Sequence, residues 1–253
     1  MIKEDNLILS IAGHDPTGGA GIQVDAQIAN FHGKHCLSIL TCETVQNLNS
    51  FEKLIPQEEK YIQRAYESLL KNFSMKYFKI GLVPNIELAN KLSDLITLKK
   101  PKIVVIDPIL KSGTGGKIFL KKDFDSLLRK LYAKATVLTP NVYELKTLTN
   151  KKSISDGILF LNERGIENVY VSGEIKKGKI RNYLYSKGNL VNIDEVPKLK
   201  IKIHGSGCAL STSILCFLIN KQSLKDACSK SQNVMKDLVK KSRNHIHQNI
   251  LKI

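Results

Sequence analysis

The sequence predicts a layered α/β fold, because short apolar runs alternate with helical segments along nearly the whole chain. The first apolar run, residues 7–12, leads into a glycine-rich loop over residues 13–21 and then into a helical pattern that closes at Gly33. A strand, a tight loop and a helix in this order are typical of the first βα unit of such a fold. No internal repeat or low-complexity linker interrupts the pattern, so we expect one domain over residues 1–253.

The other elements follow from the same periodicities. We expect strands at residues 36–41, 77–81, 103–106, 136–139 and 169–172, and a hairpin over 181–185 and 190–193. We expect helices at residues 56–73, 85–98, 123–133 and 153–164, after Cys208, and from 222 onward. Pro56 suits a helix start and Asn85 suits an N-cap. Asn141 with Glu144 predicts a capping arrangement, and the same pair equally suits a metal-linked polar site.

Charge and composition narrow the classes of partner. The 253-residue chain has 39 Lys and Arg against 23 Asp and Glu, a formal charge of +16, which raises the question of nucleic-acid binding. The lysines are scattered, aromatic residues make up 6% and Trp is absent, so platforms for base stacking are few. We therefore expect no nucleic-acid partner, and a positive field that favours an anionic small substrate.

The sequence also indicates a cellular compartment. The first five residues carry acidic groups with no apolar signal segment, and no apolar run approaches the ~18 residues of a membrane span. Five cysteines occur without a CxxC pair or metal-ligand spacing, which is typical of reduced thiols. We expect a cytoplasmic protein that does not bind membranes.

The stretch His204-Gly205-Ser206-Gly207-Cys208-Ala209-Leu210-Ser211 has the strongest chemical signal. Two glycines before a helix allow a tight turn, and the unpaired N–H groups of the first helical turn make a cradle for an anion. A thiol at such a helix start has its thiolate form favoured, so Cys208 is a candidate base or nucleophile. The alternative is a glycine-rich turn before a core helix that contains a buried cysteine.

Other candidate groups lie where predicted strands end. Glu43, Thr44, Gln46 and Asn47 follow the second strand, and Asp107 follows the strand at 103–106. Asp107 is a candidate magnesium or phosphate-site residue, or else a turn or capping Asp. Residues 111–116 suit a lid or substrate loop. The glycine-rich loop matches neither a dinucleotide fingerprint nor a Walker P-loop.

Six motifs in order resemble those of the hydroxymethylpyrimidine/phosphomethylpyrimidine kinases. Residues 12–25, AGHDPTGGAGIQVD, resemble AGSDPSGGAGIQAD, and residues 204–211, HGSGCALS, resemble HGTGCTLS. Between them lie TVQN at 44–47, KIGL at 79–82, DPIL at 107–110 and LTPN at 138–141, which resemble TAQN, KIGM, DPVM and LTPN. The match spans residues 12–211 and is highly specific as a set.

This resemblance implies a ribokinase-like three-layer sandwich with a mostly parallel central sheet, a homodimer, and a role in thiamine biosynthesis. It implies phosphorylation by MgATP of 4-amino-5-hydroxymethyl-2-methylpyrimidine and of its monophosphate. Cys208 would be the proton acceptor in a catalytic turn with Gly205, Ser206 and Gly207. The residues implied to bind substrate are Gly13, Asp15, Gly19, Ala20, Asp25, Gln46 and Leu82. The nucleotide would contact Asn141, Ser172 and Lys111, and the metal Asp107 and Glu144.

The chain departs from the family pattern mainly on the nucleotide side. Ser172-Gly173-Glu174-Ile175 stands where the family's KGGH supplies a lysine, and Asn182 stands where an Asp is usual. Lys111, Lys176 or Lys177 are the candidates to compensate. His14 replaces a Ser or Thr and Leu82 replaces a Met. Two alternative functions stay open, a pyridoxal kinase and a non-catalytic pyrimidine-binding relative.

Overall fold

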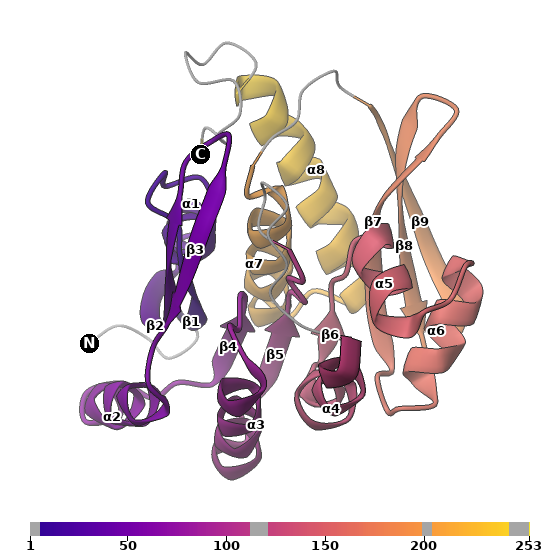
Figure 1. Ribbon diagram of the computed structural model, residues 1–253. Coiled ribbons are helices and arrows are strands. Elements are labelled where there is room, and N and C mark those ends of the chain that lie inside the picture. Colours follow the sequence, from indigo (N-terminus) through magenta and orange to yellow (C-terminus); the bar gives the residue numbers. More distant parts are fainter. Residues whose placement is uncertain (1–5, 112–120, 199–203, 243–252) are drawn as a thin grey trace.

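The computed structural model describes residues 6–111, 121–198, 204–242 and 253. Within them nine strands form one sheet in the order β3-β2-β1-β4-β5-β6-β7-β8-β9 (Figure 1). The strands are β1 Leu7–His14, β2 His35–Gln46, β3 Phe51–Pro56, β4 Tyr77–Ile80, β5 Ile103–Ile106, β6 Val137–Leu138, β7 Asn168–Lys176, β8 Lys179–Ser186 and β9 Asn189–Pro197. The six strands from β2 to β7 run parallel, and β3, β8 and β9 add antiparallel pairs at the two ends.

Helices cover both faces of this sheet. They are α1 Gly21–Phe31, α2 Glu59–Leu70, α3 Ile86–Lys99, α4 Phe124–Ser126, α5 Val142–Thr149, α6 Ile154–Asn162, α7 Ser206–Ile219 and α8 Leu224–Ser242. One hydrophobic core packs α2 to α6 against one face, and a second packs α1, α7 and α8 against the other. Neighbouring residues of β1 point into different cores, Ile8 into the second and Leu9 into the first. The three-layer sandwich with a mostly parallel sheet is confirmed.

Two boundaries differ from the sequence prediction. The strand β2 continues to Gln46 and pairs with β3, which the sequence analysis missed. Pro56 ends β3, so the prediction that it begins a helix is wrong, and α2 begins at Glu59. Pro is tolerated at the end of β3 because this strand lies at the edge of the sheet, where a missing N–H breaks no ladder.

Several other local predictions are confirmed. The Asn85 side chain accepts a hydrogen bond from Leu88 N at the start of α3, and Asn141 with Glu144 forms a capping box at the start of α5.

Other segments differ from the prediction or lie outside the described residues. The expected helix at 123–133 is broken into short 3₁₀, α and π turns over residues 121–134. The expected lid at 111–116 lies, after Lys111, outside the described residues. Among the described helices, none is long and apolar enough to cross a membrane.

Candidate active site

A cavity of about 190 Å³ opens where the parallel strands end. We call it the first cavity. It is lined by most of the residues that the sequence analysis singled out: Gly13, Asp15, Ala20, Gln46, Leu82, Asp107, Lys111, Asn141, Glu144, Ser172, Gly205, Gly207 and Cys208. The wall also contains His14, Gly21, Thr44, Phe51, Ile109, Thr139 and His204. Phe51 was missed because no strand was predicted there, whereas His204 and Thr44 stood inside the quoted motifs.

The turn before α7 is locked onto the glycine-rich loop. Gly205 has a φ of +78°, and a Cβ at this position would lie 1.9 Å from the carbonyl oxygen of Gly19. Only glycine therefore fits there. Gly19 was expected to contact the substrate, but it does not line the first cavity. Its close approach to Gly205 gives it a structural role instead. Its carbonyl supports the turn.

A hydrogen bond between side chains joins the same two segments. His204 Nε2 lies 2.7 Å from Asp15 Oδ2, and Asp15 Oδ1 accepts hydrogen bonds from the backbone N–H and the hydroxyl of Thr17. Burial raises the pKa of Asp15, but the hydrogen bonds from His204 and Thr17 outweigh it and hold this pKa below its ordinary value. The charged Asp15 carboxylate therefore connects the glycine-rich loop to the turn before α7 and also lines the cavity.

Cys208 lies at the first turn of α7 and is 5% exposed. Burial raises the pKa of its thiol to about 12, although the nearby Lys79 ammonium and a hydrogen bond from Gly21 N–H lower it in part. The expectation that the helix start favours the thiolate is therefore wrong, because loss of water around the sulfur outweighs the helix dipole. The thiol is protonated at rest, and it hydrogen-bonds to the Asp107 carboxyl group.

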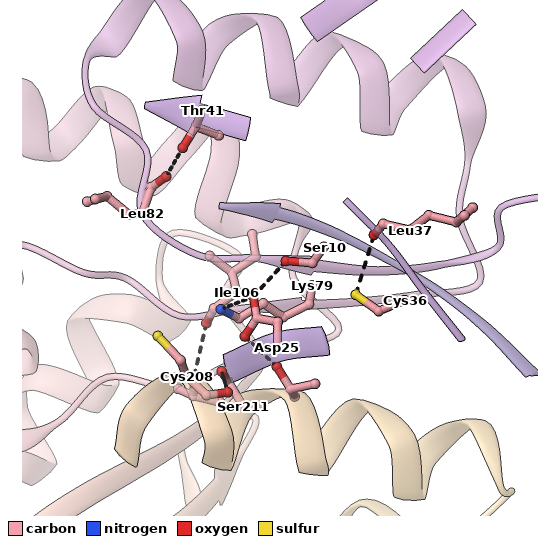
Figure 2. Close-up of polar contacts among 12 residues, drawn as sticks. Ser10, Asp25, Cys36, Leu37, Thr41, Lys79, Leu82, Ile106, Cys208 and Ser211 are labelled. Carbon is pink, nitrogen blue, oxygen red and sulfur yellow. Dashed lines mark hydrogen bonds and ion pairs between the residues drawn. The ribbon is translucent and has the colours of Figure 1, made fainter. Parts of the chain in front are cut away.

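Asp25 lies beneath the cavity and does not line it, contrary to the expectation of a substrate contact. Its carboxylate pairs with the Lys79 ammonium at 2.9 Å, and both side chains are completely buried (Figure 2). Asp25 also accepts hydrogen bonds from the hydroxyls of Ser10 and Thr212 at 2.6 and 2.8 Å. A buried charge must be paired and hydrogen-bonded, and this network meets both conditions. It ties β1, α1, β4 and α7 together under the site.

Two buried carboxyl groups face the same region. Burial and the nearby charge of Asp107 raise the pKa of Glu144 well above its ordinary value. Burial raises the pKa of Asp107 to about 6, against the lowering effect of Lys79. Asp107 Oδ2 is buried and has no hydrogen-bond partner among the described residues. A divalent cation with oxygen ligands fits this pair, because it would satisfy the orphaned oxygen and neutralise both charges.

The far end of the first cavity is shaped by Gln46 and Leu82. Gln46 Oε1 is buried without a partner among the described residues. The Thr41 hydroxyl donates to the backbone carbonyl of Leu82 at 2.6 Å and so fixes this segment (Figure 2). A Cβ at Gly13 would meet Leu82 Cδ2 at 2.8 Å and Cys42 Sγ at 2.9 Å, so glycine keeps the loop close to the wall. The amide oxygen of Gln46 is therefore available to accept a hydrogen bond from a polar ring.

A second cavity of about 210 Å³ adjoins the first, and the two share Ser172 and Gly207. Ser206, which was expected in the first cavity, lies here. The apolar part of its wall consists of Ile180, Val196, Pro197, Leu210, Met235 and Val239, and the polar part of Ser172, Ser206, Asn182, Gln232 and Lys236. The mixture of a large apolar surface with a few polar groups is typical of a small-molecule site.

A bulge in β7 builds the shared wall. Ser172 and Gly173 lie opposite the single residue Asn182 between the flanking pairs of β7 and β8. The bulge turns Ser172 toward the next strand, where its N–H donates to the carbonyl of Pro140 at 2.9 Å. Asn182 Oδ1 accepts from Gly173 N at 2.9 Å, so the N–H that the bulge frees has a partner. Asn182 also donates to Gln232 of α8.

Two of the lysines considered as replacements lie away from both cavities. Lys176 ends β7, and Lys177 has a φ of +48° in the turn before β8. Both are exposed. Lys111 lines the first cavity, and its ammonium lies 4.2 Å from the centre of the Tyr143 ring. Of the three, only Lys111 lies in the site.

Comparison with known proteins agrees with this geometry. Residues 15–251 match the family described as phosphomethylpyrimidine kinase. The chain is 25% identical over 246 residues to a hydroxymethylpyrimidine/phosphomethylpyrimidine kinase of Aquifex aeolicus, with 94% of this chain and 95% of that protein covered.

Two solved structures have the same fold. A Bacillus subtilis pyridoxal kinase in an ADP complex superposes with a TM-score of 0.82 at 24% identity, covering 93% of this chain and 92% of that one. A Staphylococcus aureus pyridoxal kinase in complex with AMP-PCP and pyridoxal has a TM-score of 0.84 at 19% identity, covering 98% and 92%. Because the family match extends over nearly the whole chain, this protein belongs to the phosphomethylpyrimidine kinase family.

Proposed function

We propose that the protein uses MgATP to phosphorylate the hydroxymethyl group of 4-amino-5-hydroxymethyl-2-methylpyrimidine and then the resulting monophosphate. The observation that carries this proposal is the pair of adjoining cavities. They meet at Ser172 of β7 and at Gly207, which lies at the start of α7. Transfer between two small molecules needs two sites that open onto one anion-binding point. The names of the relatives support the same pyrimidine substrates.

The first cavity takes the pyrimidine. Gln46, with its unpartnered amide oxygen, bonds the amino side of the ring, and Leu82 packs against the ring face. Gly13, Asp15 and Ala20 shape the loop that encloses the ring. The substrate's hydroxyl then faces the α7 turn, where Cys208 lies.

The α7 turn holds the phosphoryl group in transfer. The N–H groups of Gly205, Ser206, Gly207 and Cys208 lie at a helix start without a side-chain cap, so they are available to an anion. Mg²⁺, when bound with the nucleotide, would neutralise charge on the phosphates, and Asp107 and Glu144 are its protein ligands. No cluster of three or more metal-ligating side chains occurs in the described part of the chain. This agrees with Mg²⁺, which needs only one or two carboxylates besides the nucleotide's phosphates.

Cys208 receives the proton of the substrate's hydroxyl. Its thiol is protonated at rest, so the sulfur accepts this proton as its own hydrogen passes along the existing hydrogen bond to the Asp107 carboxyl group. In total, the substrate's hydroxyl oxygen loses one proton and the Asp107 carboxylate gains one.

The second cavity takes the nucleotide. Its apolar wall suits a base, and its polar end meets the first cavity at Ser172. Asn141 and Lys111 lie in the first cavity, on the side where the transferred phosphoryl group would enter. ADP and AMP-PCP are named in the structures of the two pyridoxal kinases with the same fold, which supports ATP as the donor.

A product assay tests this proposal. The hydroxymethylpyrimidine and its monophosphate are each incubated with MgATP, and the phosphorylated products are identified by mass. We expect both products, and we expect Cys208→Ala to lower kcat by about 10²–10⁴-fold with unchanged pyrimidine affinity. Cys36→Ser is the control, since Cys36 lines neither cavity. Full turnover by Cys208→Ala would contradict the proton role. Tight pyrimidine binding without any product would instead indicate a non-catalytic relative.

Pyridoxal is the second candidate substrate, because pyridoxal kinases have the same fold as this chain. The same assay with pyridoxal separates the two. A kcat/KM for pyridoxal above that for the hydroxymethylpyrimidine would reverse our assignment.

We also propose that residues 1–253 form a single kinase domain and that two copies of the chain form a homodimer. The strand β3 is an edge strand, and Val45 and Ile55 on the β2–β3 pair are 41% and 40% exposed, which supports a partner on this ribbon. Light scattering at micromolar concentration measures the mass, and a monomer would contradict the dimer. A single unfolding transition is expected of one domain.

A further inference from the structure

The second cavity has an unusual charge distribution for a site that receives a polyphosphate. The side chains that close it around the β7 bulge are neutral: Ser172, Asn182 and Gln232. The start of α7 contributes only the partial charge of a helix dipole, roughly half an elementary charge. Within the second cavity itself, any full positive charge for a polyphosphate has to come from another part of the wall.

Lys236 is the one ionisable side chain among the described residues that line this cavity. It is half-buried on α8 and makes no hydrogen bond or ion pair with any described residue. A lysine without a partner normally extends into water, since its charge is costly to bury. Lys236 instead lines a cavity and is half-buried, and its ammonium has no partner among the described residues that would keep it from a ligand.

The position of Lys236 on α8 is well defined. Gln232 precedes it by four residues, so both side chains project from the same face of the helix. Gln232 accepts a hydrogen bond from Asn182, which anchors this face of α8 to the bulge in β7. Met235 and Val239 lie on either side of Lys236 along the chain, and both line the same cavity. The Lys236 side chain thus projects from an anchored helix into a cavity that Met235 and Val239 also line.

The lysines first considered for this role are placed differently. Lys176 and Lys177 lie at the end of the β7–β8 hairpin, outside the second cavity, and Lys111 lies over Tyr143 in the first. We propose that Lys236 is the phosphate-binding cation of the second cavity, supplied from α8 in place of a lysine on β7. This inference rests on the proposed nucleotide site and adds the residue that binds the nucleotide's charge.

Nucleotide affinity measured by calorimetry on the full chain tests the assignment. We expect Lys236→Gln to raise the Kd of ATP by about tenfold, the effect of one charge-assisted hydrogen bond. The Kd of adenosine, which lacks phosphate, should not change. Lys236→Arg should restore ATP affinity, and the Kd of ATP should rise less steeply with salt in Lys236→Gln than in the wild type. Lys230→Gln is the matched control, because Lys230 is exposed on the same helix and donates to Gln222.

The outcomes separate this inference from the function on which it rests. A wild-type chain that does not bind ATP would overturn both. Wild-type binding with an unchanged Kd of ATP in Lys236→Gln would overturn the Lys236 assignment alone. Equal losses for ATP and adenosine would also overturn it, since Lys236 would then support the cavity rather than contact phosphate.

Discussion

The two cavities of the site are built from different kinds of interaction. The first cavity stands on buried carboxylates that already have partners within the protein: Asp25 pairs with the Lys79 ammonium, and Asp15 is hydrogen-bonded to His204. The second is walled by apolar side chains and by the neutral amides of Asn182 and Gln232, with Lys236 as its one charge among the described residues. The proposed pyrimidine side is therefore preorganised by charged groups, whereas the proposed nucleotide side is shaped mainly by packing and neutral hydrogen bonds.

This difference indicates how each half tolerates change. A buried ion pair loses its compensation when one partner is removed, so the first cavity is sensitive to single substitutions. A neutral hydrogen-bond network costs less to disturb, because the groups left behind carry no net charge. A cation supplied from α8 in place of one on β7, as we propose for Lys236, therefore requires no change in the sheet.

The largest expected effect comes from breaking the buried pair under the first cavity. Lys79→Met keeps the apolar stem but leaves the Asp25 carboxylate buried without its countercharge. We expect a loss of about 3–5 kcal/mol in the free energy of unfolding, measured by urea denaturation at pH 7. The double variant Lys79→Met/Asp25→Asn should recover part of this loss. A single variant as stable as the wild type would contradict the importance of the pair.

A smaller effect is expected in the second cavity. Asn182→Ala removes the acceptor of Gly173 N and also the donor to the buried Gln232 amide oxygen, and we expect a cost of about 1–3 kcal/mol. The bulge then loosens, so the KM for ATP should rise while the KM for the pyrimidine stays within twofold. Asn189→Ala is the control, since Asn189 is exposed at the other end of the β8–β9 hairpin and donates only to Lys187 O. A change confined to the pyrimidine KM would show that the two cavities are not separate in this way.

The smallest effect depends on pH. Hydrogen bonds from His204 and Thr17 hold the pKa of Asp15 below its ordinary value of 3.8 in the folded protein, so the unfolded chain binds this proton more readily. The stabilisation is complete at pH values above 3.8 and is lost as the pH falls below it toward the folded pKa. We expect Asp15→Asn to cost about 1 kcal/mol at pH 7 and much less at pH 3. Urea midpoints at both pH values measure this, and an equal cost at each would show that the charge of Asp15 contributes no stability.

Much of the fold was predictable because local patterns and tertiary packing agree. Ile103–Ile106 is β-branched throughout and forms the buried strand β5, and the capping pair Asn141 and Glu144 begins α5 as expected. The edge strand β3 was missed because residues 51–56 carry Glu52 and Lys53 and show no apolar alternation, and none of them is buried in the fold. Its pairing with β2, rather than its own composition, makes it a strand.

The sequence by itself determined the α/β order, the motifs of the first cavity and the tight glycine turn before α7, because each depends on a few consecutive residues. Tertiary structure alone decided that Asp25 is buried beneath the cavity and that the thiol of Cys208 is protonated. It also decided that Lys236 of α8 lies in the same cavity wall as Ser172 of β7. The physical reason is that desolvation and charge pairing depend on which distant segments pack together, and a linear motif contains no information on either.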